Sequence, residues 1–251
     1  MKTALVVGGA NGVGLSIATE LAGREDVEKV YIVDKAPLSE GNDKFEYHQF
    51  DLTSSDYSLF DRFGDVDTLM ITAGFGRLQL FRDVDDAMIT SSFNVNTIPV
   101  LRIIRRFYPK LESRDTDFFC GVMVSIAGFM TSPFFSVYAA TKAALKVFIE
   151  SVNVELVKAG SINRILNVSP GSLKGTSFNS GKTDLSVVAP MAREIISHLE
   201  RKDDLFIPQY DEIYKNVLAR YAADFRAEGI HSYEYKVQSG RVKISDDIVE
   251  S

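Results

Sequence analysis

Tyr138 and Lys142 lie four residues apart, a spacing that suits a pair of side chains acting in proton transfer. On a helix, residues at this spacing share one face. A tyrosine alone has a pKa of about 10 and is a poor base at neutral pH, but a nearby ammonium group favours the phenolate. Moving the pKa by about three units takes about 4 kcal/mol, which one close, partly desolvated charge and a second positive group could supply. The pair is therefore suited to exchanging a proton with an alcohol or a carbonyl.

Ser125 lies thirteen residues before Tyr138, at the end of an apolar run. A hydroxyl at this place can hydrogen-bond a substrate oxygen and hold it near the tyrosine. A lone Tyr-x-x-x-Lys also occurs by chance on solvated helix faces, and a lone serine often only ends a strand. A catalytic role for the three residues therefore depends on the elements that bring them together.

A glycine-rich turn follows the first apolar run, with Gly8, Gly12 and Gly14 in the order Gly-x-x-x-Gly-x-Gly. Such a turn lets the backbone approach a pyrophosphate and starts a helix whose amides point at the phosphates. Asp34 ends the next apolar run, about twenty residues further on, where a carboxylate accepts hydrogen bonds from ribose hydroxyls and repels a 2′-phosphate. The pattern predicts a dinucleotide site that prefers NAD, with NADP as the less favoured cofactor, although the adjacent Lys35 could weaken the preference.

Short β-branched runs alternate with longer segments of helical periodicity, which is typical of βαβ units. The runs are almost continuously apolar, as expected for a parallel sheet buried on both faces. The predicted strands are Ala4–Val7, Val30–Asp34, Phe45–Phe50, Thr68–Ile71, Phe118–Ser125 and Ile162–Val168. The predicted helices are Gly12–Gly23, Ser54–Phe63, Val84–Leu111 (two helices meeting near Asn94), Val137–Ala159 and Leu185–Arg201. We expect an α/β fold, with a Rossmann-type, doubly wound parallel sheet and helices on both faces, over residues 1–208.

The pattern changes after Arg201. Leu205–Ile207 fits a last strand, and Asp211–Ala227 has the pattern of a helix rich in aromatic and charged residues. From Gly229 onward polar and aromatic residues alternate, and no element is predicted there. We expect residues 209–251 to form a helical C-terminal extension that packs on the main domain or serves as a lid or an interface.

Composition narrows the classes of function. The 251 residues are 45% hydrophobic and 25% charged, which suits a globular chain with a core, and the net charge of −6 does not favour nucleic acid or anionic lipid as a partner. A single cysteine, Cys120, permits no intrachain disulfide, and it and the three histidines show no spacing of metal ligands. No run approaches the about 18 apolar residues that span a bilayer, and Met1–Val7 is too short for a signal peptide. We expect a soluble, cytoplasmic protein without a metal, in which Cys120 is a buried apolar residue.

The glycine turn, Ser125, Tyr138 and Lys142 together resemble the classical short-chain dehydrogenase/reductase family, a likeness that runs from about Thr3 to Thr176. The resemblance implies an NAD(P)-dependent enzyme that interconverts an alcohol and a carbonyl by hydride transfer. It implies that Tyr138 is the acid/base, that Ser125 holds the substrate oxygen and that Lys142 also binds the nicotinamide ribose.

The same resemblance implies further site residues. An asparagine on the helix after the fourth strand would hold a water that relays protons toward the lysine; Asn96 aligns best, and Asn94 is the alternative. Pro170-Gly171 matches the turn beside the nicotinamide, and Thr176 lies near the position that meets the carboxamide, one residue late. The implied catalytic set is Ser125, Tyr138, Lys142 and Asn96. The implied cofactor-binding set is Gly8, Asn11, Gly12, Val13, Gly14, Asp34, Asp51, Leu52, Ala73, Gly74, Tyr138, Lys142, Pro170, Gly171 and Thr176.

The chain departs from the family pattern at several places. Val7 stands where the family usually has threonine, and Ile71–Gly74 contains Thr72 where the family has Asn-Asn-Ala-Gly. Phe206–Tyr210 lacks the glycine-rich final strand of the family, which puts the usual homotetramer in doubt. We expect a homodimer through the helices that hold Asn96 and Tyr138, with the homotetramer as the alternative.

By the same resemblance, the substrate pocket lies between the segment that follows Ser125 and the segment that follows Pro170. Phe129, Met130, Phe134 and Phe135 on one side and Phe178 on the other predict a partly apolar pocket for a small-molecule alcohol or carbonyl, although some of these residues could pack an interface instead. Arg77 could meet an acidic group or be solvated.

Two other functions fit parts of the sequence. An epimerase or dehydratase of the extended branch is disfavoured by the short chain and the glycine spacing. A catalytically silent NAD(P)-sensing protein of the same fold is the second alternative, supported by Val7, Thr72 and the unusual C-terminal segment.

Overall fold

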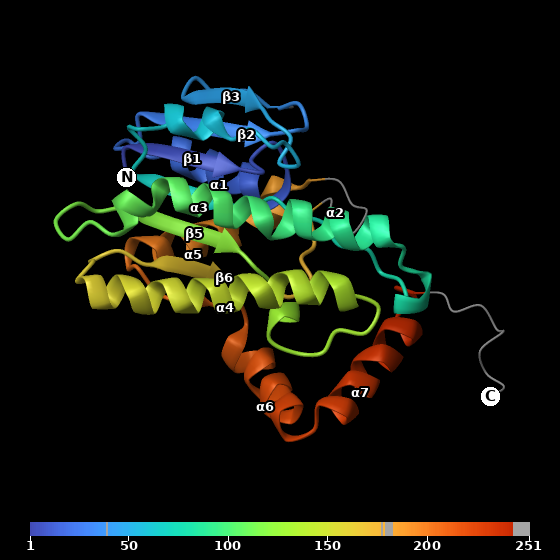
Figure 1. Cartoon of the computed structure of the whole chain (residues 1–251). Coiled ribbons are helices and arrows are strands. Elements are labelled where there is room, and N and C mark those ends of the chain that lie inside the picture. The colour runs from blue at the N-terminus through green and yellow to red at the C-terminus, as the bar shows by residue number, and fades with distance from the viewer. Residues whose placement is uncertain (39, 177, 179–182, 243–251) are drawn as a thin grey trace.

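A parallel sheet forms the centre of the computed structural model, which describes residues 1–38, 40–176, 178 and 183–242 (Figure 1). Its seven strands lie in the order β3-β2-β1-β4-β5-β6-β7, and every neighbouring pair is parallel. The order reverses between β1 and β4, the place where open α/β sheets bind ligands at the carboxyl ends of the strands. The strands are β1 (Thr3–Val7), β2 (Lys29–Asp34), β3 (Phe45–Gln49), β4 (Thr68–Ile71), β5 (Phe119–Met123), β6 (Ile165–Val168) and β7 (Leu205–Phe206).

Helices cover both faces of the sheet (Figure 1). Alternate residues of each strand point to opposite faces, and in β1 Leu5 joins the apolar cluster beneath α3 and α4 while Val6 joins the cluster beneath α1 and α5. The predicted doubly wound α/β fold is confirmed. The helices are α1 (Gly12–Ala22), α2 (Asp86–Asn96), α3 (Ile98–Leu111), α4 (Ser136–Ala159) and α5 (Leu185–Glu200), with short helical turns η1 (Ser58–Arg62), η2 (Phe81–Asp83) and η3 (Ile126–Gly128).

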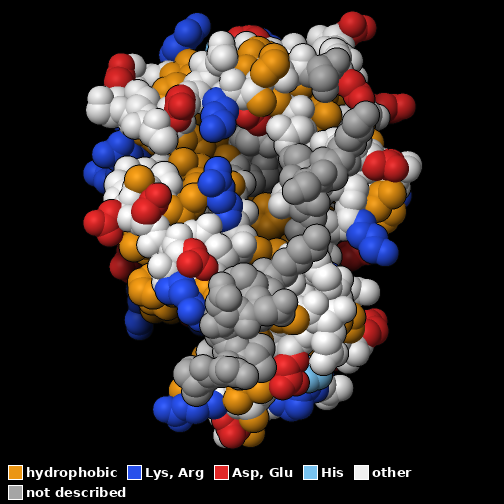
Figure 2. Space-filling model, turned by 90° about the vertical axis from the view of Figure 1, so that its right-hand side faces the viewer, with side chains coloured by type: hydrophobic (Ala, Val, Ile, Leu, Met, Phe, Trp, Pro, Cys, Tyr) orange, Lys and Arg blue, Asp and Glu red, His pale blue; other side chains and the backbone are white. Residues whose placement is uncertain are grey.

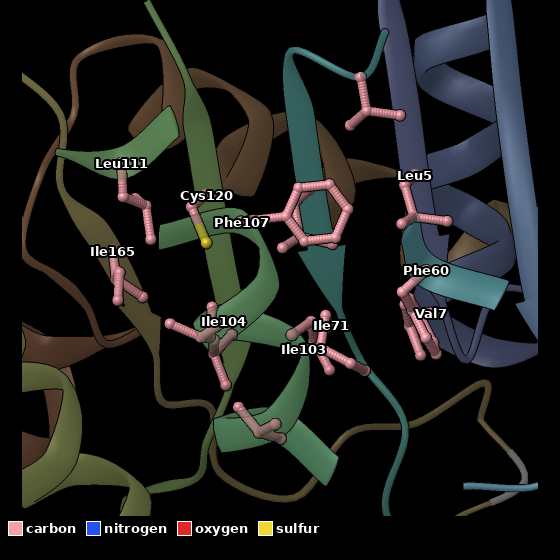
Figure 3. Close-up of a cluster of buried hydrophobic side chains, with 14 of the residues drawn as sticks. Leu5, Val7, Phe60, Ile71, Ile103, Ile104, Phe107, Leu111, Cys120 and Ile165 are labelled. Carbon is pink, nitrogen blue, oxygen red and sulfur yellow. The ribbon is translucent and has the colours of Figure 1, made fainter. Parts of the chain in front are cut away.

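The cluster beneath α3 and α4 is shown in Figure 3, where Ile103, Ile104 and Phe107 of α3 lie over β4 and β5. Cys120 lies inside this cluster with 1% of its surface exposed. It is the buried apolar residue that the sequence predicts, and burial raises the pKa of its thiol.

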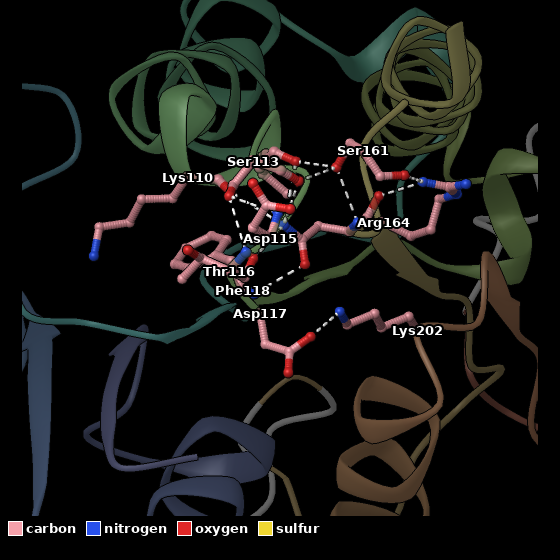
Figure 4. A network of polar contacts seen from close by, with 11 residues as sticks. Lys110, Ser113, Asp115, Thr116, Asp117, Phe118, Ser161, Arg164 and Lys202 are labelled. Atoms are coloured by element: carbon pink, nitrogen blue, oxygen red, sulfur yellow. Dashed lines mark hydrogen bonds and ion pairs between the residues drawn. The ribbon is translucent and has the colours of Figure 1, made fainter. Parts of the chain in front are cut away.

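A polar network closes the loops at the amino ends of β5 and β6 (Figure 4). The Ser161 hydroxyl donates to the carbonyl of Leu111, and the Asn163 side chain accepts a hydrogen bond from the amide of Phe118. Lys202 pairs with Asp117 on the same side. These contacts satisfy buried polar groups at the edge of the sheet opposite to the carboxyl ends.

Two predicted helical segments and two predicted strands differ from those observed. Ser54–Phe63 is reduced to η1, because the Asp56 carboxylate accepts hydrogen bonds from the amide and hydroxyl of Ser58 and so delays the helix. The junction between α2 and α3 falls at Thr97 and not near Asn94, because Pro99 has no N–H to donate to the preceding turn. The predicted strands Phe118–Ser125 and Ile162–Val168 are longer than the observed strands β5 and β6.

The C-terminal region forms more helix than the sequence predicts. In place of one helix over Asp211–Ala227 there are a π-helical turn η5 (Tyr210–Tyr214), α6 (Lys215–Ala223) and α7 (Phe225–Gln238). Asp224 breaks the run, since it is extended and its carboxylate caps the first amides of α7.

The helices α6 and α7 form a V beside the start of α4 (Figure 1). The predicted division of the chain at residue 208 stays a prediction, and residues 243–251 of the predicted extension lie outside the described residues. Within the described part of the chain, none of the helices has the length and apolar character needed to cross a membrane.

Candidate active site

The predicted site residues gather at the carboxyl edge of the sheet, the side of the molecule that faces the viewer in Figure 2. That face is hollowed, with apolar side chains at its base and basic side chains along one rim. The loops that follow β1, β2, β4, β5 and β6 meet there, because all of these strands run in the same direction.

The turn after β1 requires glycine at several of its positions. Gly8 has φ +83° and Gly12 has φ +56°, in the left-handed region. A Cβ at Gly14 would overlap the carbonyl oxygen of Gly8 and lie 2.5 Å from the hydroxyl oxygen of Thr72. A Cβ at Gly8 would lie 2.5 Å from the amide nitrogen of Ala73. The bare backbone of this turn fits the close approach of a pyrophosphate.

The first turn of α1 begins directly after the N-cap residue Asn11, so the amides of Gly12 and Val13 lie at the positive end of the helix. The Gly12 amide donates to the hydroxyl of Thr183 over 2.9 Å. Thr176 also lies against Gly12, with Cβ 3.8 Å from the place of a Cβ on that glycine. Thr176 and Thr183, both later in the chain than β6, therefore lie against the glycine turn. Sequence reasoning missed Thr183, which belongs to no motif.

Asp34 lies at the end of β2 with both carboxylate oxygens held by the backbone. One oxygen accepts from the amide of Ala10 over 3.0 Å and the other from the amide of Ala36 over 2.9 Å. A carboxylate oxygen has a second lone pair, so this arrangement orients Asp34 and still leaves acceptors for ribose hydroxyls.

Asp51 and Leu52 lie after β3, on the same edge as Asp34. The Asp51 carboxylate accepts hydrogen bonds from the amide and the hydroxyl of Thr53, both over 2.8 Å. These bonds hold the pKa of the Asp51 carboxyl below its usual range. Asp51 is therefore a fixed negative charge on the rim.

Thr72, one of the departures from the family pattern, ties the end of β4 to the end of β1. Its hydroxyl lies 3.0 Å from the carbonyl oxygen of Val7 and 2.9 Å from that of Gly8. Thr72 thus fixes the start of the glycine turn, through a contact with Val7, which lies 65 residues earlier in the chain.

The structure places Asn96, and not Asn94, beside Lys142. Asn96 is fully buried; its amide group donates to the carbonyl of Phe75 over 2.8 Å and accepts from the amide of the same residue over 2.9 Å. A Cβ on Gly74 would lie 3.2 Å from the Asn96 side-chain oxygen and 3.4 Å from the Lys142 ammonium. Asn96 therefore fixes the loop after β4 next to the lysine.

Ser125, Tyr138 and Lys142 come together where β5 ends and α4 begins. The Ser125 hydroxyl lies 3.4 Å from the carbonyl oxygen of Pro170, so the serine is tied to the turn after β6. The Lys142 ammonium donates to the carbonyl of Met123 over 2.9 Å and lies 5.7 Å from the centre of the Tyr138 ring. The predicted trio is thus assembled in space.

Burial disfavours the charged form of both Tyr138 and Lys142. It raises the pKa of Tyr138 to about 12, while hydrogen bonding with Ser125 works in the opposite direction. It lowers the pKa of Lys142 to about 8. A phenolate at Tyr138 near neutral pH therefore requires positive charge beyond that of Lys142.

Aromatic rings line the side of the cleft near β4. The rings of Phe135 and Phe178 lie 5.3 and 5.4 Å from that of Tyr138. A Cβ on Gly76 would lie within 2.9 to 3.1 Å of all three rings. The adjoining pocket is lined by Gly76, Arg77, Gln79, Val84, Met88, Ser92 and residues 134–138.

Not all of the aromatic residues predicted for the pocket lie in it. Phe134 and Phe135 line the pocket, and Phe178 lies against Gly76 and Tyr138, whereas the Lys146 ammonium lies 5.1 Å from the centre of the Phe129 ring. Arg77 does line the pocket.

The chain is similar to several known proteins. A family model described as short chain dehydrogenase matches residues 2–185. The uncharacterized oxidoreductase YDL114W of Saccharomyces cerevisiae is 27% identical over 222 residues, which are 79% of this chain and 70% of that protein. Dehydrogenase RED2 of Cochliobolus heterostrophus is 27% identical over 170 residues, which are 64% of this chain and 63% of that protein, so the chain spans less than two thirds of that relative.

Among solved structures, a short chain dehydrogenase from Burkholderia cenocepacia in complex with NADP superposes with a TM-score of 0.75 at 23% identity, over 92% of this chain and 99% of that one. At this identity the likeness concerns the fold.

Proposed function

This chain belongs to the short-chain dehydrogenase family, and from that premise we propose that it is an NAD(H)-dependent oxidoreductase that interconverts an alcohol and a carbonyl, with Tyr138 as the acid/base. The observation that carries the proposal is the convergence of Ser125, Tyr138 and Lys142 beside the glycine turn. Family membership supports a nicotinamide-dependent oxidoreductase; the reaction at the alcohol carbon and the choice of nucleotide are our proposal.

The residues present fit a nicotinamide dinucleotide. The turn has no room for a side chain at Gly8 or Gly14 and offers amides to a pyrophosphate, and Asp34 offers an oriented carboxylate to the ribose. When bound, the cofactor supplies a carbon that accepts or gives a hydride. We propose NAD over NADP, because a carboxylate aimed at a 2′-phosphate is costly. The Burkholderia cenocepacia structure contains NADP, and a comparison of NADH and NADPH binding tests the proposed preference.

The protein residues divide the proton chemistry among them. Tyr138 takes the alcohol proton in oxidation and returns it to the carbonyl oxygen in reduction. Ser125 hydrogen-bonds the same oxygen and holds it against the tyrosine. Lys142 stabilises the phenolate electrostatically. Asn96 keeps the loop around Phe75 in place beside the lysine.

The outer face of α4 supports the proposed dimer. Val147, Val154 and Val157 are 58%, 63% and 54% exposed and recur at intervals that place them on one side of the helix. Burying such a face against a second copy would remove apolar surface from water. Light scattering of the wild type and of Val154→Glu tests this: a dimer that becomes a monomer in the variant is expected.

The primary experiment compares NADH and NADPH binding through the fluorescence of the nicotinamide, since the chain has no tryptophan. We expect tighter binding of NADH, followed by turnover in a carbonyl screen. Binding without any turnover would favour the sensing role and contradict the enzyme. Binding of neither nucleotide would contradict both.

A further inference from the structure

A tyrosine of the C-terminal extension lies directly on the turn after β6. A Cβ at Gly171 would overlap the hydroxyl oxygen of Tyr214 and lie 2.7 Å from its Cζ. This contact is open only to glycine. The preceding residue, Pro170, accepts hydrogen bonds at its carbonyl from the Ser125 hydroxyl over 3.4 Å and the Ile126 amide over 3.0 Å. The Tyr214 phenol thus contacts the residue next to Pro170, whose carbonyl accepts the hydrogen bond from the proposed catalytic serine.

The order of the strands fixes which side of Ser125 the phenol occupies. β5 lies between β4 and β6, so Ser125, which follows β5, lies between Gly76, which follows β4, and Gly171, which follows β6. On the β4 side a pocket lies beside Gly76, lined by aromatic, aliphatic and polar side chains. On the β6 side Tyr214 occupies the space above Gly171. The cleft is therefore asymmetric about the serine.

The conformation of the backbone before Tyr214 orients this residue toward Gly171. Gln209 adopts the left-handed conformation, with φ +59°, and its carbonyl accepts from the amides of Ile213 and Tyr214 in η5. A non-glycine residue in this conformation persists only where its surroundings hold it. Tyr214 is half-buried, and burial raises the pKa of its phenol. Tyr210, one turn earlier in η5, is 43% exposed and provides a matched control.

We propose that Tyr214 is a specificity-determining residue that restricts the substrate on the β6 side of Ser125. The carbonyl carbon then carries a small group such as methyl on the side of Gly171 and a larger apolar or aromatic group on the side of Gly76. The inferred substrates are methyl ketones and the matching secondary alcohols. This inference rests on the proposed oxidoreductase function.

Reduction of two aryl ketones, methyl phenyl ketone and propyl phenyl ketone, tests the inference. The wild type is expected to prefer the methyl ketone. Tyr214→Ala is expected to raise the ratio of kcat/KM for the propyl ketone to that for the methyl ketone by at least about tenfold, because one methylene group in an apolar pocket changes kcat/KM by about that factor. Tyr214→Phe keeps the ring and is expected to keep the ratio within about threefold, and Tyr210→Ala should leave it unchanged. An unchanged ratio in Tyr214→Ala, with the methyl ketone still reduced, would overturn the inference and leave the proposed function standing.

A second test needs no turnover. The unfolding free energy is measured for the wild type, Gly171→Ala, Tyr214→Ala and the double variant. If the phenol lies on Gly171, the alanine at 171 is strongly destabilising beside Tyr214 and much less so once the ring is removed, so the two changes are not additive. Additive changes in an active enzyme would overturn this inference alone. A wild type that binds NADH and reduces neither ketone nor any other carbonyl would overturn both proposals.

Discussion

The cofactor half and the substrate half of the cleft are built differently. The cofactor half is centred on the glycine turn, Asp34 and Asp51, which lie within the first 51 residues, and later residues such as Thr72 and Thr183 contact the backbone of that turn. The substrate half is assembled from separate stretches of the chain, which contain Gly76, residues 125–138, Pro170 and Gly171 with Phe178, and residues 209–242. A continuous segment leaves a motif in the sequence, whereas a surface made from distant segments leaves none.

The substrate half depends on the C-terminal extension for its shape. Lys236 of α7 is buried and donates to the carbonyl of Pro133 over 2.9 Å. Phe134 has φ +67° and stacks on Tyr233 of α7, with ring centres 4.5 Å apart. The segment held in this way leads directly to Phe135, whose ring packs on Tyr138. We therefore expect changes in the extension to alter handling of the substrate and to leave nucleotide binding alone.

The largest expected effect separates chemistry from nucleotide binding. Tyr138→Phe removes the hydroxyl that exchanges the proton, so turnover should fall by a factor of about 10³ or more. The dissociation constant for NADH should stay within about twofold, because the ring is retained. Steady-state kinetics and a fluorescence titration measure the two quantities, and full activity in the variant would rule out the proposed mechanism.

The next largest effect is expected from a substitution in the cofactor half of the cleft. Gly14→Ala forces a methyl group onto the Gly8 carbonyl and the Thr72 hydroxyl, so NADH affinity should drop at least about tenfold and stability by about 1–3 kcal/mol. Gly23→Ala is the control, since a Cβ there would make only ordinary contacts of 3.5 Å. Equal behaviour of the two variants would show that the glycine turn is looser than described.

A smaller effect concerns the substrate half. Lys236→Met removes the hydrogen bonds that hold Pro133 and the neighbouring serines, so KM for the carbonyl should rise about fivefold to tenfold while NADH affinity is unchanged. Lys215→Met, at a 63% exposed side chain of α6, serves as the matched control. A loss of NADH affinity in Lys236→Met would erase the distinction between the two halves.

The smallest effect is a pH dependence of stability. Burial, with a smaller contribution from Arg241, lowers the pKa of Lys236 to about 8 from 10.5. Between these pH values the unfolded chain binds more protons at this residue, so its contribution to stability rises with pH. The difference in unfolding free energy between the wild type and Lys236→Met should grow by about 1 kcal/mol from pH 7 to pH 9. Denaturant titrations at the two pH values measure it, and a constant or shrinking difference would contradict the shift.

The sequence alone determined the fold class and the proposed catalytic trio. The glycine spacing, Asp34 at a strand end and the four-residue spacing of Tyr138 and Lys142 depend on the geometry of one turn, one strand or one helix. Such local geometry repeats in every chain with the same pattern. Two boundaries also carried readable signals that the predictions missed, namely Pro99 at the junction of α2 and α3 and Asp224 as the cap of α7.

Only the tertiary structure decided the contacts between distant segments. It placed Asn96 against Phe75 beside Lys142, bonded the Thr72 hydroxyl to the carbonyls of Val7 and Gly8, and brought Thr183 to the Gly12 amide. It also laid Tyr214 on Gly171. None of these pairs has a fixed spacing in the chain, because their distance is set by how strands and helices stack and not by the period of either element.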